Sequence, residues 1–278
     1  MLSVKRITTI LSFVTMLLLL TVTCMAASPS AKADSEEKHE LPVKEYRTKA
    51  GVVNVAVPYL SGAAGGKSVD DKVNQAVFDY VNAMMKQILS TQEAEAFDKE
   101  KSGAAADDMI RYNSELAKYT NKMIANRNDT GKVTASWYVR NDYEVKAARK
   151  GFYSVILKTK TYTGGPGDVI TWKAMNFDLK DGSLLELKDL FEGGADYATR
   201  LQTLIGYQQM GRARLQHVIK GKELKKPSPV EISGEEDFYV DDHYNLGIIL
   251  KSGKEGSTSV DMQVFDISLN DFADLIKL

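Results

Sequence analysis

Few residues of this 278-residue sequence are spaced for chemistry, and the most suggestive motif is SGAAGGKS at positions 61–68. A phosphate-binding P-loop has the pattern G-x-x-x-x-G-K-[ST], in which glycine amides wrap the phosphates and the lysine reaches the outer ones. Gly66, Lys67 and Ser68 fit this pattern, but Ser61 stands where the first glycine belongs. We therefore expect a loop ahead of a capped helix, not a nucleotide site.

The sequence offers little for metal or nucleophilic chemistry. Its three histidines, His39, His217 and His243, have no H-x-x-x-H or H-E-x-x-H spacing, and the single cysteine is Cys24. No G-x-S-x-G nucleophile elbow is present. We therefore predict no metal and no cofactor, and we expect that the protein is not an enzyme.

Acidic residues are the remaining candidates for catalysis. Glu235 begins a run of three acidic residues, and Asp241 and Asp242 follow shortly after it. A cell-wall hydrolase or modifying enzyme would need two such carboxylates to converge in a concave pocket with aromatic walls. Sequence spacing does not establish such convergence, so this class of enzyme is kept as an alternative.

A corner of small residues between two expected strands is the best candidate for a binding surface. Its candidate contact residues are Tyr162, Thr163, Gly164, Gly165 and Trp172. A rigid turn edged by aromatic rings can dock a glycan or a protein loop. The competing interpretation is a tight corner whose aromatic rings face the core.

The elements that must position this corner follow from residue periodicity. Alternating apolar and polar residues predict strands at 52–60, 133–146, 151–162, 169–179, 238–240, 246–250 and 259–267. Asp181-Gly182 predicts a turn into a short further strand. Apolar residues at helical spacing predict helices at about 69–91, 105–126 and 195–219, and Ser268 caps a short terminal helix. Strands in meander order with inserted helices indicate an α+β fold, with a mainly antiparallel sheet and long helices packed on it.

Composition excludes some partners. The chain is 44% hydrophobic and 26% charged, so it can bury a core, and its net charge is −1. Nucleic-acid binding normally requires a basic face or stripe. We therefore expect no nucleic-acid partner.

The first residues predict export. Lys5 and Arg6 precede an uncharged run at 7–27, which is the pattern of a secretory signal peptide. An uncleaved membrane anchor is the alternative, because about 20 apolar residues can span a bilayer. Lipidation at Cys24 is a third possibility. The protein then resides in the periplasm, on the cell surface or outside the cell, and contacts the membrane only through this segment if it is retained.

These patterns divide the chain into three segments. We expect a signal peptide or anchor at 1–33, a flexible polar lead-in at 34–51, and one α+β domain at 52–278, with two sub-lobes meeting near 165–190. Removal of the first segment would leave no cysteine, which favours a bacterial envelope protein over a disulfide-rich secreted one.

Several motifs resemble a known family. YTGG, then NFDLKDGSLLELKDLF, then DFYVDDHYNLGIIL, together with the upstream VPYL strand, resemble the RsiV-like extracytoplasmic domain over roughly 52–278. This domain occurs in anti-sigma-V factors, in non-catalytic modules of peptidoglycan deacetylases, and in exported proteins of unknown function. The family corner usually has the sequence T-G-G-A-H-G, whereas Pro166 and Gly167 replace the Ala and His here.

The resemblance implies a binding role, because anti-sigma members of the family bind lysozyme through such loops. Only six residues precede the apolar run, so we expect no sigma-binding segment. The resemblance covers most of the chain and leaves no room for a deacetylase domain, so we expect none. The sequence thus predicts a non-enzymatic exported envelope protein that recognises a lysozyme-like protein or cell-wall glycan (peptidoglycan). A hydrolase is one alternative, and a structural or assembly protein that pairs through a sheet edge is another.

Overall fold

The computed structural model describes residues 40–101, 108–129, 137–221, 223–224, 226–252 and 261–277. The chain divides into two units, Met1–Lys38 and His39–Leu278, and all described residues belong to the second. The expected signal segment, Cys24 and His39 lie outside the described residues. Within those ranges, no helix is both long and apolar enough to cross a membrane.

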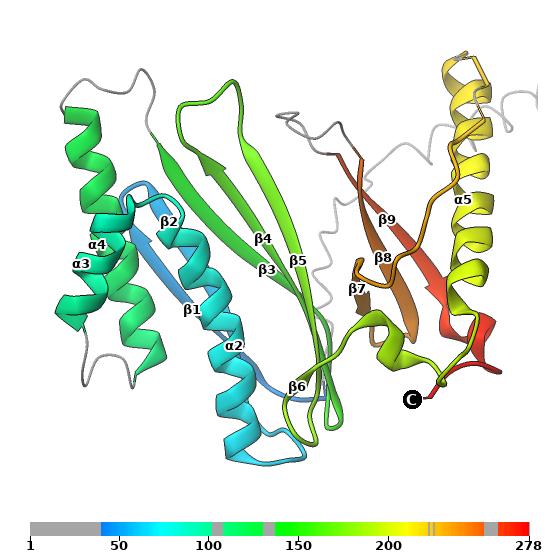
Figure 1. Ribbon diagram of the computed structural model, residues 1–278, viewed down its shortest axis with the longest axis horizontal. Helices are drawn as coiled ribbons and strands as arrows, with labels where there is room; N and C mark the ends of the chain where they lie inside the picture. Colours follow the sequence, from blue (N-terminus) through cyan, green and yellow to red (C-terminus); the bar gives the residue numbers. More distant parts are fainter. Residues whose placement is uncertain are drawn as a thin grey trace, which may run out of the picture. The chain divides into compact units, whose positions relative to one another are not determined.

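A six-stranded sheet has the order β1-β2-β3-β4-β5-β6 (Figure 1). Its strands are β1 (Val43–Ala50), β2 (Val53–Leu60), β3 (Tyr138–Arg149), β4 (Phe152–Tyr162), β5 (Val169–Asp178) and β6 (Ser183–Leu184). All neighbours are antiparallel except β2 and β3, which pair in parallel from Val53↔Val139 to Val55↔Asn141. Parallel strands need a long crossover, and the helices between β2 and β3 supply it.

Three helices make up this crossover: α2 (Lys67–Lys86), α3 (Thr91–Lys101) and α4 (Met109–Asp129). α2 and α4 pack against the sheet, and α3 packs on α4 through Phe97. Together they form the first core; fully buried members include Val55, Val73, Val77, Leu116 and Leu157. The expected helices at 69–91 and 105–126 correspond to α2 and α4, whereas α3 was not predicted. Only Phe97 of α3 is buried, so its helical periodicity is weak in the sequence.

A second, three-stranded antiparallel sheet has the order β7-β8-β9. Its strands are β7 (Asp237–Val240), β8 (Asn245–Ser252) and β9 (Asp261–Ser268), and the helical elements near it are η1 (Leu187–Leu190), α5 (Tyr197–Lys220) and η2 (Leu269–Phe272). They enclose a second core, whose fully buried members include Leu201, Ile205, Leu246, Phe265 and Phe272. Ser268 caps η2 by accepting from the Asn270 amide, as predicted.

The two sheets meet where β7 lies against β5. Asn176 of β5 is buried, and its Nδ2 donates to the Phe238 carbonyl of β7 at 2.6 Å. Ser154 Oγ of β4 donates to Asn176 Oδ1 at 2.7 Å. A small third cluster fills the contact, with Ile156 and Ala174 against the second sheet. One buried amide therefore ties three strands from two sheets together.

The predicted α+β class is confirmed. The expected flexible lead-in at 34–51 is wrong for residues 43–50, which form β1 and pair with β2 along its whole length, and its first residues, 34–39, lie outside the described residues. Gly51, at φ +55°, closes the hairpin between the two strands. The strand is rich in Lys, Arg and Glu, which is typical of an edge strand that faces water.

Candidate functional site

One face of β3, β4 and β5 is the face opposite the helices. Side chains alternate between the two faces of a sheet, so the neighbours of core residues such as Val139 and Leu157 point away from the first core. Cross-strand register places Tyr138 opposite Tyr162, Arg140 opposite Lys160, and Lys158 opposite Trp172. We call this surface the ladder face; its residues are Tyr138, Arg140, Glu144, Lys158, Lys160, Tyr162, Asp168 and Trp172.

At the corner end, the ladder face joins two aromatic rings to a charged pair. The rings of Tyr138 and Tyr162 are stacked, with centroids 6.1 Å apart, and the Arg140 guanidinium lies 5.0 Å from the Tyr138 centroid. Tyr138 Oη donates to Asp168, whose other oxygen lies 2.6 Å from Lys160 Nζ. Hydrogen bonds from Lys160 and then Tyr138 lower the pKa of Asp168. Asp168 is therefore an anchored carboxylate, not a proton donor.

Farther along the strands, a second cluster alternates cations with rings. Lys158 Nζ lies 2.5 Å from Glu144 Oε2 and 4.5 Å from the centroid of the Trp172 ring. Lys146 Nζ pairs with the other oxygen of Glu144 and lies 4.4 Å from the Tyr239 centroid. Burial alone would raise the pKa of Glu144, but hydrogen bonds from the two lysines outweigh it, so the pKa is lowered. Cation–π and ionic contacts thus connect β3, β4, β5 and β7 across this face.

The predicted contact residues are only partly brought together. Tyr162 is half-buried at the end of β4, and Thr163, Gly164 and Gly165 form the exposed turn that follows. Gly164 has φ +87°, and a Cβ there would lie 3.2 Å from Trp137 Nε1. Trp172 shares the face with Tyr162 but lies opposite Lys158, four residues along β4, or about 13 Å away.

The structure adds residues to the site that local sequence patterns do not indicate. Tyr138 stacks on Tyr162 of the corner and donates to Asp168, and Lys158 covers the ring of Trp172. The period-2 alternation of β3 and β4 is the signal that would have placed them on one face. Which residues oppose each other depends on register, and register is set by the turns and by a bulge in β3 between Val145 and Ala147.

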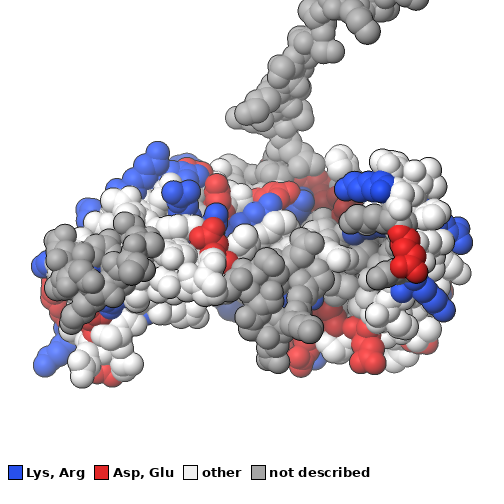
Figure 2. Space-filling model, turned by 90° about the horizontal axis from the view of Figure 1, so that it is seen from above, with Lys and Arg blue, Asp and Glu red and all other residues white. Residues whose placement is uncertain are grey.

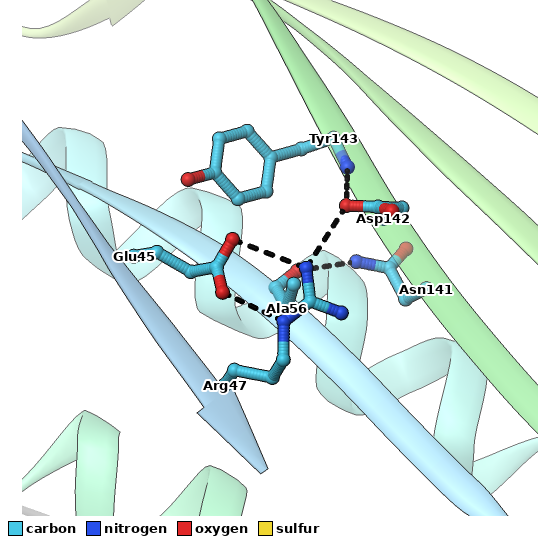
Figure 3. Close-up of polar contacts among 6 residues, drawn as sticks. All are labelled: Glu45, Arg47, Ala56, Asn141, Asp142 and Tyr143. Atoms are coloured by element: carbon cyan, nitrogen blue, oxygen red, sulfur yellow. Dashed lines mark hydrogen bonds and ion pairs between the residues drawn. The ribbon is translucent and has the colours of Figure 1, made fainter. Parts of the chain in front are cut away.

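Charged contacts continue from β3 onto β1, as Figure 3 shows. Arg47 Nε lies 2.6 Å from Glu45 Oε1, and Arg47 Nη2 lies 3.4 Å from Asp142 Oδ1. In the same view, Asn141 Nδ2 donates to the Ala56 carbonyl at 2.7 Å and so extends the short parallel contact between β2 and β3. Basic and acidic side chains therefore alternate across the contact between β1 and β3.

The acidic candidates do not converge. Glu235 precedes β7 and lines a cavity of about 510 Å³ with Lys173 and Asp237, which are themselves paired at 2.6 Å. Asp241 and Asp242 follow β7, six or more residues and about 20 Å along an extended chain from Glu235.

Both of these aspartates have structural partners. Asp241 accepts from the amides of His243 and Asn245 at 2.9 and 2.8 Å, so it stabilises the turn after β7. Asp242 Oδ1 lies 3.1 Å from Arg149 Nε. Across the described ranges, no group of His, Cys, Asp and Glu residues is arranged to hold a metal ion.

Backbone amides of the P-loop-like segment, 61–68, already donate hydrogen bonds to other groups of the fold. Asp70 of α2 accepts from the amides of Gly62 and Ala63 at 3.0 and 2.9 Å. The amides of Ala64 and Gly65 donate to the carbonyls of Lys150 and Leu179. The amide of Gly66 donates to the Ala63 carbonyl, so all five amides from 62 to 66 are already used within the fold. The expected side-chain cap is not formed, because α2 begins at Lys67 and its N-cap residue is Gly66, which has no side chain to accept a hydrogen bond.

The fold resembles solved structures, although no family model matches the sequence and the comparison with curated proteins gives no match. A crystal structure of a member of the DUF3298 family from Bacteroides fragilis aligns with 86% of this chain and 94% of its own, with a TM-score of 0.51 and 16% identity. A DUF3298 family protein from Pseudomonas aeruginosa covers 86% and 93% respectively, with a TM-score of 0.47 and 13% identity. DUF3298 is the RsiV-like family that the sequence motifs resemble. At this identity the likeness concerns the fold alone: the chain shares the fold of the Bacteroides fragilis protein.

Proposed function

We propose that this protein is a non-enzymatic binding protein of the bacterial envelope, and that the ladder face and the adjoining corner contact its ligand. The observation that carries the proposal is the alternation of cations and aromatic rings on a sheet face opposite the helices. Trp172 packs with Ile156 and Ala174 at the contact with the second sheet, so the part of the face nearer the corner offers its charged and aromatic side chains on a rigid support. The dispersal of the acidic candidates favours recognition over hydrolysis.

A protein ligand of lysozyme type fits the ladder face better than a glycan. Sugars stack on open ring faces, but Lys158 covers one face of Trp172, and Tyr138 and Tyr162 stack on each other. Protein interfaces, in contrast, use such anchored charges and ring edges around a tightly packed centre. The exposed turn at Thr163–Gly165 then supplies a loop contact beside the charged residues of the ladder face.

Calorimetry tests this proposal. The chain from Asp34 to Leu278 is titrated with a lysozyme and, separately, with purified peptidoglycan, and glycan release is assayed in the same samples. We expect saturable binding without release, and at least tenfold weaker binding in the variant Lys158→Glu with Lys160→Glu.

The matched control is Lys67→Glu, because Lys67 is an exposed lysine paired with Asp71 at 2.6 Å on α2, which packs on the opposite face of the sheet. Glycan release, or binding that the double variant leaves unchanged, would refute the proposal.

Pairing through a sheet edge is the second candidate, and the free side of β5 favours it. The short β6 pairs only with Phe177 and Asp178, and no other described strand pairs with residues 169–176 on that side. Val169 and Ile170 are 55% and 41% exposed there. An exposed edge strand can accept a strand from a partner.

The variant Ile170→Lys separates this candidate from the first. An inward or edge lysine blocks strand addition without disturbing the core. If strand pairing operates, sedimentation velocity should show concentration-dependent association in the parent protein and a monomer in the variant. A parent protein that stays monomeric at all concentrations would rule out pairing between copies of this chain.

A further inference from the structure

The last part of α5 extends past the sheet that its first part packs on. Gln208 Nε2 and Arg212 Nη2 each donate at 2.7 Å to carbonyls of β9, those of Asp266 and Val264. Beyond Arg212 these contacts end, and every residue from 214 to 220 is exposed. Eight residues beyond Arg212 correspond to about 12 Å of helix.

This exposed part carries apolar side chains on one side. Leu215, Val218 and Ile219 are 59%, 79% and 68% exposed, and their spacing of three and four residues places them together. The helix is regular up to its C-terminus, where Gly221 adopts the left-handed conformation typical of a C-terminal cap. The apolar stripe is thus presented on regular helix, and its three side chains pack in neither of the two cores described above.

Basic residues surround the stripe. Arg214, Lys220 and Lys226 form no ion pair within the described part of the chain, although the whole chain has a net charge of −1. Arg214 and Lys226 also share the lining of a cavity of about 640 Å³ between α5 and residues 226–230. Figure 2, which looks down on this end of α5, shows basic side chains next to uncharged surface, with acidic side chains among them.

We propose that the C-terminal end of α5 docks on an anionic lipid bilayer surface. Leu215, Val218 and Ile219 would enter the boundary between headgroups and acyl chains, and the surrounding Arg and Lys would contact lipid phosphates. This is the arrangement of an interfacial amphipathic helix, in which apolar burial and attraction to anionic lipids add. The inference goes beyond the proposed ligand-binding function and does not depend on it.

A second copy of the chain fits this stripe less well. Three side chains bury far less than the roughly 1,200–2,000 Å² of a stable protein interface. A symmetric pairing would also bring the same basic residues of both copies together, which is unfavourable.

Vesicle sedimentation tests the proposal. The compact unit holds both cores, so the chain from Asp34 to Leu278 is mixed with vesicles of phosphatidylglycerol and phosphatidylcholine, or of phosphatidylcholine alone, at low and high salt. We expect binding to the anionic vesicles only, weakened by salt. The variant Leu215→Ser, Val218→Ser and Ile219→Ser should bind at least tenfold more weakly, and Arg214→Glu with Lys220→Glu should bind similarly weakly.

The control variant is Val169→Ser with Leu184→Ser, which removes two exposed apolar side chains from another surface and should bind as the parent does. Three outcomes would overturn the proposal: no binding to anionic vesicles, equal binding to both vesicle types, or binding that the α5 variants leave unchanged. Self-association that the triple variant abolishes, in the absence of vesicle binding, would assign the stripe to a second copy instead.

Discussion

On the ladder face, the single residue Lys158 links residues of the two strands on either side of it. Its ammonium contacts the carboxylate of Glu144 on β3 and the ring of Trp172 on β5 at the same time. A lysine held from two sides loses side-chain freedom before any ligand arrives, so less entropy is lost on binding. The ladder face is therefore preorganised by its own side chains.

Glu144 should make stability depend on acid pH. Its pKa is lowered from 4.5 in the folded protein, so its contribution is complete above that value and is lost as the pH falls through the lower folded value. Glu144→Gln should therefore lower the free energy of unfolding by up to about 1 kcal/mol at pH 6 and by much less at pH 3. Urea denaturation at both pH values measures this difference.

The control for this prediction is Glu95→Gln on α3, where the carboxylate is exposed and has no described partner. That substitution should change the unfolding free energy equally at both pH values. A deficit in Glu144→Gln that grows toward acid pH would mean that burial of the carboxylate outweighs its two lysine partners.

At the scale of elements, Asn176 decides how the two sheets hold together. Asn176→Ala leaves the buried Phe238 carbonyl and the Ser154 hydroxyl without their partner, and such a loss costs about 1–3 kcal/mol. Thermal unfolding should therefore shift to lower temperature. Ser154→Ala removes only one of the two bonds and should be milder; equal losses in both variants would contradict the role given to the link between β5 and β7.

The helices and strands differ in how well sequence patterns predict them. β3, β4 and β5 follow from alternation, and α2 from apolar residues at helical spacing, because each of these elements buries a full face. β1 was missed because an edge strand made of charged residues carries no apolar alternation. α3 was missed because it buries only Phe97, although Ser90 and Glu93 form the S-x-x-E capping pattern that marks its start.

The candidate site is less predictable than the strands that carry it. The corner residues Tyr162–Gly165 follow from local composition, but the placement of Trp172 opposite Lys158 follows from register. The contact of Lys146 with Tyr239 joins residues of different sheets, and nothing local in the sequence indicates it. Long-range pairings of this kind arise only once the second sheet packs on the first.

At the scale of the whole molecule, the six-stranded sheet contains a hairpin, β1 with β2, and a meander, β3 with β4 and β5. We call the short parallel contact between β2 and β3, which joins them, the seam. β1 with β2, and β3 with β4 and β5, are each joined by short turns. The contact between β2 and β3 is a short parallel pairing from Val53↔Val139 to Val55↔Asn141, flanked by the hydrogen bond from the Val139 amide to the Val52 carbonyl and by the bond from Asn141 to Ala56. The latter spans 85 residues of sequence. The helical crossover must therefore be largely packed before the seam can close.

That seam has a consequence for how the chain folds. Contacts between residues distant in sequence form late, because the entropy of closing the intervening loop is lost before the contacts repay it. The hairpin and the meander can form early and independently, and the joining of β2 to β3 becomes the slow step. Until it closes, the inner edges of both pieces are unpaired, which leaves a newly made chain open to mispairing with its neighbours for longer than its short hairpins alone would suggest.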